Sequence, residues 1–102
     1  MVQTRKASAS LEAFMDLCHE KAREAGFKGP SAFRGMRTKH GTWLASKMLV
    51  ESGALQDGLE WARDNGLLAY TVEAGVIKFA DEFDPATVQC AKWRLALMEK
   101  AA

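Results

Sequence analysis

The sequence predicts a mainly α-helical fold, a compact bundle of five or six short helices. Apolar residues recur at spacings of three and four along most of the chain, which is the period of an amphipathic helix. The chain holds only two prolines and many alanines, a composition that favours helices over a β-sandwich. With 102 residues, of which 48% are apolar and 26% charged, it has the size and composition of one globular domain.

The first two helices are delimited by small and turn-forming residues. We expect a flexible lead-in over residues 1–9 and a single helical domain over residues 10–102. Ser10 is a candidate N-cap, and the helix that follows ends at Gly26, since glycine readily takes the left-handed conformation beyond a helix. Gly29-Pro30-Ser31 opens the second helix and His40-Gly41 ends it, because proline suits a first helical turn. The inward-facing residues are Leu11, Phe14, Met15, Cys18, Ala22, Ala25, Phe33 and Met36.

Similar signals predict three further helices. Thr42 can cap a third helix that ends at Ser52-Gly53, and a fourth helix ends at Asn65-Gly66. Asp84-Pro85 starts the last helix, because it combines an N-cap carboxylate with proline at the first helical position. The apolar residues of these helices are Trp43, Leu44, Leu49, Val50, Leu55, Leu59, Ala62, Val88, Ala91, Leu95 and Met98.

Two structures fit the segment from Leu67 to Phe83. Alternating apolar residues around a turn at 73–75 predict a small β-hairpin over residues 67–80, which would give a winged-helix-like fold with Lys78 on the wing. Alternatively, Thr71 caps a helix whose apolar face holds Val72, Val76, Phe79 and Phe83. Gly75 costs about 1 kcal/mol inside a helix and the β-branched content favours strands, so periodicity alone leaves both structures open.

Residues 40–95 carry a series of short motifs. The stretch His40-Gly41-Thr42-Trp43-Leu44-Ala45-Ser46-Lys47-Met48-Leu49 resembles the Gly…Ala-Ala-Lys-x-Leu segment of a small bacterial domain family of unknown function. Gly58-Leu59, Gly66-Leu67-Leu68, Tyr70-Thr71-Val72-Glu73-Ala74, the segment from Phe79 to Phe83, and Ala91-Lys92-Trp93-Arg94-Leu95 are similar to its later motifs. Leu67 stands where that family has Arg, and Ala69 where it has Asp. The resemblance implies short helical elements, favours a helix over residues 71–83, and implies no activity.

Residue types that carry catalysis or bind metals are few. His19 lies next to Cys18, but neighbours on a helix point about 100° apart, so the two form a poor catalytic dyad. The sequence contains no zinc-ligand spacing and no phosphate-binding loop. The acidic residues Asp81, Glu82 and Asp84 are explained by a solvated loop and a helix cap. We therefore expect no enzymatic activity, no metal and no cofactor.

The cysteines and the N-terminal segment indicate the cellular location of the protein. Cys18 and Cys90 are far apart in sequence and do not resemble the framework of a secreted disulfide-rich protein. The basic start leads into Ala and Ser rather than an apolar stretch, and no apolar run approaches the roughly 18 residues of a membrane span. We expect a cytoplasmic protein with no membrane contact.

The net charge of +1 conceals an uneven distribution. Residues 1–47 hold nine basic and four acidic side chains, whereas residues 48–102 hold five basic and nine acidic ones. No acidic residue occurs between Ala25 and Val50. The cations of that interval form either a solvated face or a patch that contacts phosphates, and they are Lys28, Arg34, Arg37, Lys39 and Lys47.

This patch predicts a non-enzymatic binding module that acts on nucleic acid or a nucleoprotein complex through residues 28–47. A helix-turn-helix fits loosely, since Gly41 suits its turn but Arg37 stands where a small residue is expected. The alternative is a phage- or plasmid-type inhibitor or adaptor, similar in format to anti-CRISPR and antirestriction proteins, that works by protein–protein contact. An exposed Trp61 or Trp93 would anchor that contact, although a core position is expected for each of the three tryptophans.

Overall fold

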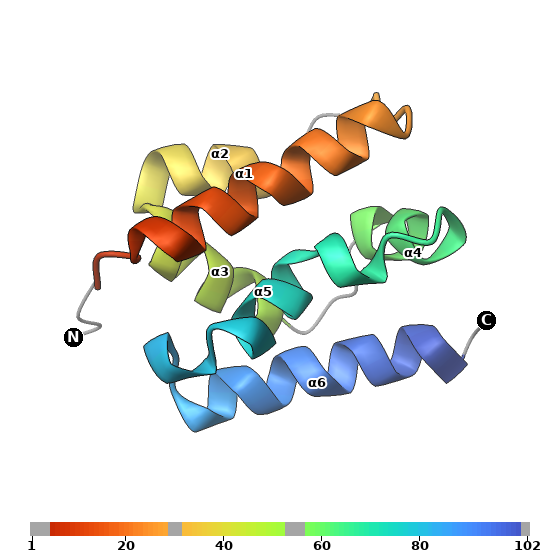
Figure 1. Cartoon of the computed structure of the whole chain (residues 1–102). Helices are drawn as coiled ribbons and strands as arrows, with labels where there is room; N and C mark the ends of the chain where they lie inside the picture. The colour runs from red at the N-terminus through yellow and green to blue at the C-terminus, as the bar shows by residue number, and fades with distance from the viewer. Residues whose placement is uncertain (1–4, 29–31, 53–56, 101–102) are drawn as a thin grey trace.

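The structure is a computed structural model that describes residues 5–28, 32–52 and 57–100. These residues form a helical bundle without strands, which confirms the predicted fold class (Figure 1). The α-helices are α1 (Ala9–Glu24), α2 (Ala32–His40), α3 (Thr42–Glu51), α4 (Asp57–Asp64), α5 (Val72–Lys78) and α6 (Pro85–Lys100), and the short 3-10 helices are η1 (Leu68–Tyr70) and η2 (Ala80–Glu82). Within this described part, no helix is both long and apolar enough to cross a membrane.

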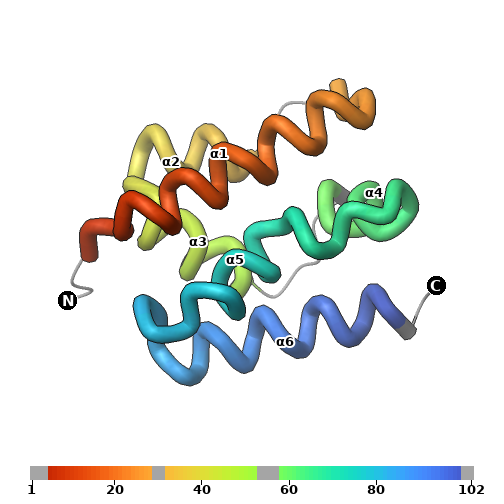
Figure 2. The backbone as a smooth tube through the Cα atoms, viewed as in Figure 1, coloured from red at the N-terminus to blue at the C-terminus, as the bar shows by residue number. Residues whose placement is uncertain are grey.

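Helix α5 lies between α1 and α6 and contacts both (Figure 2). Helix α3 contacts α2, α5 and α6, and α4 packs against η1 and α6. The radius of gyration of 12.7 Å is what a compact chain of this length should have. Buried residues of the central core come from four helices (α1, α3, α5 and α6) and the turn after η2, and they are Leu11, Met15, Trp43, Val50, Val76, Phe83, Val88 and Ala91.

Of the two structures left open for residues 67–83, the helix capped by Thr71 is the one that forms, so the alternative β-hairpin over residues 67–80 and the winged-helix-like fold are wrong. Thr71 is the N-cap of α5, and its side chain accepts a hydrogen bond of 3.2 Å from the Ala74 amide. Gly75, which argued against a helix, lies where α1 approaches α5. A Cβ atom at this position would sit 2.6 Å from Met15 Cε. The glycine therefore serves close helix packing rather than a turn.

Glycines end three segments as the sequence predicts. Gly26, Gly41 and Gly66 have φ angles of 99°, 83° and 71°, in the left-handed region that favours glycine. The predicted start of α2 at residues 29–31 lies outside the described residues, as do Gly53 and Leu55 of the neighbouring predictions. Thr42 is the first residue of α3 rather than its cap, which is Gly41.

The start of α1 is anchored earlier than the sequence predicts. Its N-cap is Ser8 rather than Ser10, and the Ser8 side chain accepts a hydrogen bond from the Leu11 amide. The backbone amide of Ser8 donates to Glu82 Oε1 at 3.0 Å, and its hydroxyl donates to Glu82 Oε2 at 2.6 Å. The same glutamate accepts, through its backbone carbonyl, a hydrogen bond of 2.7 Å from Trp43 Nε1. The segment before α1 is thus tied to η2 and α3.

Candidate functional site

A polar groove lies between α1 and the α2–α3 pair. It has a volume of about 430 Å³. Carboxylates and His19 from α1 form one wall, and two arginines from α2 lie on the other. The residues that line it are Glu12, Asp16, His19, Glu20, Arg34, Arg37, Thr38, Gly41 and Thr42. Two of the five predicted site residues, Arg34 and Arg37, therefore share one groove.

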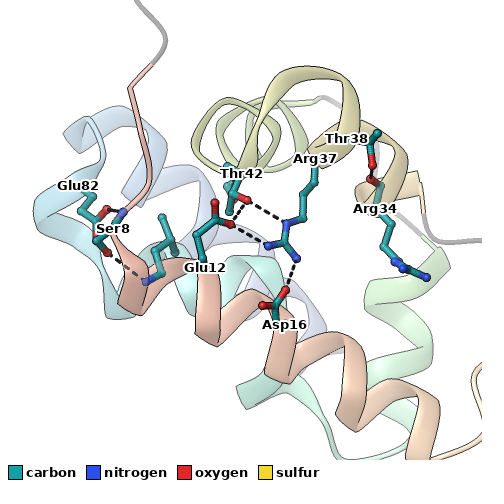
Figure 3. A network of polar contacts seen from close by, with 10 residues as sticks. Ser8, Glu12, Asp16, Arg34, Arg37, Thr38, Thr42 and Glu82 are labelled. Carbon is teal, nitrogen blue, oxygen red and sulfur yellow. Dashed lines mark hydrogen bonds and ion pairs between the residues drawn. The ribbon is translucent and has the colours of Figure 1, made fainter.

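Arg37 connects the two walls of this groove (Figure 3). Its Nη2 donates to Glu12 Oε1 at 2.8 Å and its Nη1 donates to Asp16 Oδ1 at 3.0 Å. Its Nε donates to Thr42 Oγ1 at 3.0 Å, and the Thr42 hydroxyl in turn donates to Glu12. Only 19% of the Arg37 side chain is exposed. A guanidinium presents several donors in a fixed fork, so this one side chain holds α1, α2 and the start of α3 together.

Lys47 is engaged in a second cluster, between α3 and α6. Its ammonium donates to Glu51 Oε2 at 2.7 Å, to Asp84 Oδ2 at 2.9 Å and to the buried Thr87 hydroxyl at 3.1 Å. These contacts, with the hydrogen bond to Glu51 the strongest cause, raise the pKa of Lys47. Burial opposes ionisation of Glu51, but hydrogen bonds from Lys47 and Thr87 outweigh it and lower the pKa of Glu51. The Lys47 hydrogen bond likewise lowers the pKa of Asp84.

The remaining predicted cations are exposed. Arg34 and Lys39 lie on α2, and Lys28 follows α1. Figure 3 shows the Arg34 guanidinium directed away from the Arg37 network. Of the five predicted residues, Arg34, Lys39 and Lys28 are exposed, and Arg37 and Lys47 bind carboxylates of neighbouring helices.

No protein family, curated protein or solved structure matches this chain.

The groove offers little for covalent chemistry. Cys18 lies outside it, and burial raises the pKa of its thiol to about 12, so the reactive thiolate is suppressed at neutral pH. Its Sγ lies 3.9 Å from the Thr71 carbonyl oxygen. Among the residues that the structure describes, no three His, Cys, Asp or Glu side chains are placed to hold a metal ion.

The structure also places residues that the sequence prediction missed. Arg94 and Glu73 form an ion pair of 2.8 Å in the interior, with side-chain exposures of 1% and 3%. The sequence pattern does indicate that Arg94 is buried, because its position lies between Ala91 and Met98 on the buried stripe of α6. The expectation that all three tryptophans are core residues is wrong for Trp93, which is 60% exposed, whereas Trp43 is buried.

Proposed function

We propose that this protein is a non-enzymatic binding module that contacts nucleic acid, alone or in a nucleoprotein complex, through the exposed cations of α2. The observation that carries the proposal is the composition of this helix. It has no buried residue and no acidic residue, and Arg34, Gly35, Thr38 and Lys39 form one exposed face. Arginine and lysine on a helix face are the groups that bind phosphates most often.

Arg37 and Lys47 have a different role in this proposal from Arg34, Lys39 and Lys28. Their charges are neutralised by carboxylates at 2.7 to 3.0 Å, so they position helices rather than contact phosphate. Arg37 fixes α2 against α1 and thereby sets the orientation of the exposed face. The interface proposed for nucleic acid is therefore narrower than the sequence interval 28–47.

The fold supports contacts to the phosphate backbone rather than readout of bases. In a helix-turn-helix the second helix enters the major groove. Here the second helix of the pair is α3, whose buried residues include Trp43, Ala45, Ser46 and Val50, so it has no free face of that kind. The hairpin that would supply a wing is a helix. We expect binding with little sequence preference and a salt dependence of about two to three phosphate contacts.

Charge reversal on α2 tests this proposal. We compare wild type, an Arg34→Glu/Lys39→Glu variant, and a Lys78→Glu/Lys92→Glu control that makes the same change in net charge on α5 and α6. Binding to labelled duplex DNA, single-stranded DNA and RNA is followed by fluorescence anisotropy at about 50 mM salt, where phosphate contacts are strong. The α2 variant should bind at least about tenfold more weakly than the control.

Two outcomes would overturn it. In the first, the wild-type protein has no measurable affinity for any of the three nucleic acids. In the second, the α2 variant keeps its helical circular dichroism spectrum and binds nucleic acid as tightly as the control variant does.

One observation favours the second candidate, an inhibitor or adaptor that binds a protein. Trp93 is 60% exposed on α6, and tryptophan is the residue type that most often anchors protein interfaces. This function predicts a complex with one protein partner that is insensitive to salt and lost in a Trp93→Ser variant. Pull-down at low and high salt measures both properties. A complex that survives the Trp93→Ser change would count against it.

A further inference from the structure

A second groove lies on the other side of α1 from the polar one. It has a volume of about 450 Å³ and is open to solvent. Its lining is mainly apolar and includes Phe14, Ala69, Tyr70, Ile77, Lys78 and Leu95. Phe14 and Asp16 are two positions apart on α1, so their side chains point about 200° apart around the helix. The two grooves therefore use opposite faces of α1, and a ligand can occupy one without touching the other.

A further exposed apolar residue of α1 lies outside the lining of this groove. Leu17 is 42% exposed, and it lies three positions after Phe14 and four before Lys21, so the three residues share one side of the helix. An exposed leucine beside an apolar groove adds to the apolar area that a partner would contact there.

Two ammonium groups flank the groove. Lys21 Nζ lies 5.3 Å from the centre of the Tyr70 ring, and Lys78 Nζ lies 6.0 Å from the centre of the Phe14 ring. Both rings line the groove. Within the described residues, neither lysine has a carboxylate within 4 Å, in contrast to Lys47 with its two carboxylates. The groove thus combines an apolar floor with positive charge that lacks a close internal counter-ion.

We propose that this groove is the docking site for an acidic amphipathic helix of a partner protein. Apolar residues of that helix, at spacings of three and four, contact Phe14, Ile77 and Leu95, and its carboxylates pair with Lys21 and Lys78. Such a helix lying in an apolar groove is a common mode of peptide recognition. An extended peptide is disfavoured because the described residues contain no strand whose edge it could extend. A small ligand is disfavoured because the groove is open, whereas small-molecule sites enclose most of their ligand.

This inference is independent of the α2 proposal, and the experiment is designed to keep the two separate. A display library of helical peptides is selected on the folded protein, and enriched peptides are bound to labelled protein for chemical-shift mapping. We expect enriched sequences with an apolar stripe and net negative charge. Their shifts should cluster on Phe14, Tyr70, Ile77 and Leu95.

Variants then test the named contacts. Lys78→Glu should weaken the selected peptide about tenfold, because an attraction becomes a repulsion at the rim of the site. Binding should recover when the glutamates of the peptide are replaced by lysines. Ala69→Glu places a carboxylate on the exposed groove wall and should weaken the original peptide at least as much. Lys39→Glu, on the exposed face of α2, is the matched control and should leave peptide binding unchanged.

Several results would overturn the proposal. These are the absence of enrichment, enriched peptides without acidic residues, shifts outside the groove, or a Lys78→Glu variant that binds the original peptide as tightly as the Lys39→Glu control. Saturable binding of dodecanoate with the same shifts, without peptide binding, would assign the groove to a small amphiphile. Self-association that Ala69→Glu abolishes would assign it to a second copy of this chain.

Discussion

Arg94 on α6 donates a hydrogen bond of 2.8 Å from Nε to Oε2 of Glu73 on α5, and both side chains are almost completely buried. The Arg94 Nη1 also donates to the Ser52 carbonyl oxygen at 3.3 Å, so the pair connects α5 and α6 to the end of α3. Removing two charges from water is costly, and the cost is offset only while both partners are present. This ion pair makes the packing of three helices depend on two charged residues.

We expect loss of one partner to be far more damaging than loss of both. Arg94→Met leaves the Glu73 carboxylate buried without its ion-pair partner and should lower the free energy of unfolding by about 3–5 kcal/mol. A Glu73→Leu/Arg94→Met variant, which fills the same space with apolar atoms, should recover most of that loss. Urea unfolding followed by circular dichroism measures both variants.

The control is Arg63→Met, which removes the ion pair between Arg63 and the largely exposed Asp64. It should cost less than about 1 kcal/mol, since an ion pair with one largely solvated partner contributes little. A cost for Arg94→Met as small as that of the control would show that the interior pair does not stabilise the fold as argued.

Arg37 should contribute to stability although it lies in the predicted binding interval. Arg37→Met keeps the aliphatic stem but removes the hydrogen bonds to Glu12, Asp16 and Thr42. We expect a loss of about 1–2 kcal/mol, which is small for three hydrogen bonds because both carboxylates are partly solvated. Lys39→Met on the same helix should change stability by less than about 0.5 kcal/mol, because Lys39 is exposed. Equal thermal unfolding midpoints for the two variants would contradict the positioning role of Arg37.

The Lys47 cluster should make the protein sensitive to acid. The pKa values of Glu51 and Asp84 are lower in the folded state than in the unfolded chain, so the unfolded chain takes up these protons first. Their stabilising contribution is complete above the unfolded values of about 4 and is lost as the pH falls through the folded values. The raised pKa of Lys47 acts in the opposite direction, so its contribution is lost only as the pH rises above about 10.

A Lys47→Met variant isolates this effect. It should unfold more easily than wild type at neutral pH, and its stability should fall less between about pH 5 and pH 3 because the carboxylates have lost their cation. Urea unfolding midpoints across this pH range provide the comparison. Parallel acid profiles for the two proteins would contradict the assignment of the acid sensitivity to this cluster.

Much of the fold could be predicted because its signals are local. Asp84-Pro85 identifies the start of α6, and Gly26, Gly41 and Gly66 identify segment ends because each takes a backbone conformation that glycine favours. Gly75 left the choice between helix and hairpin open because its role is not local. Its role is set by Met15, which is distant in sequence, and no local pattern reports that contact.

The candidate site could be predicted only in part, because a cation in a sequence does not reveal its partners. The contact between Lys47 and Glu51 is readable from their spacing of four residues on one helix. The contacts from Lys47 to Asp84 and from Arg37 to Glu12 join distant segments and become visible only in the fold. Arg34, Lys39 and Lys28 are the predicted cations that the fold leaves exposed. The family resemblance over residues 40–95 stays a prediction.

Two glycines in helices allow a matched test of the packing between α1 and α5. A Cβ atom at Gly35 in α2 would have no heavy atom within 4 Å, so Gly35→Ala should stabilise the protein by about 0.5–1 kcal/mol through helix propensity. A Cβ atom at Gly75 would lie 2.6 Å from Met15 Cε and 3.1 Å from the Phe14 ring. Overpacking costs about 1–3 kcal/mol, so Gly75→Ala should be destabilising despite the same gain in propensity.

Met15→Val removes the atom nearest to the added Cβ, and in the Gly75→Ala background it should recover part of the lost stability although it shortens a buried side chain. The stabilities of wild type, Gly35→Ala, Gly75→Ala and Gly75→Ala/Met15→Val are compared by thermal and urea unfolding. If Gly75→Ala stabilised the protein as much as Gly35→Ala does, Met15 and Phe14 would have to shift freely. The close approach of α1 and α5 would then not be what requires glycine at position 75.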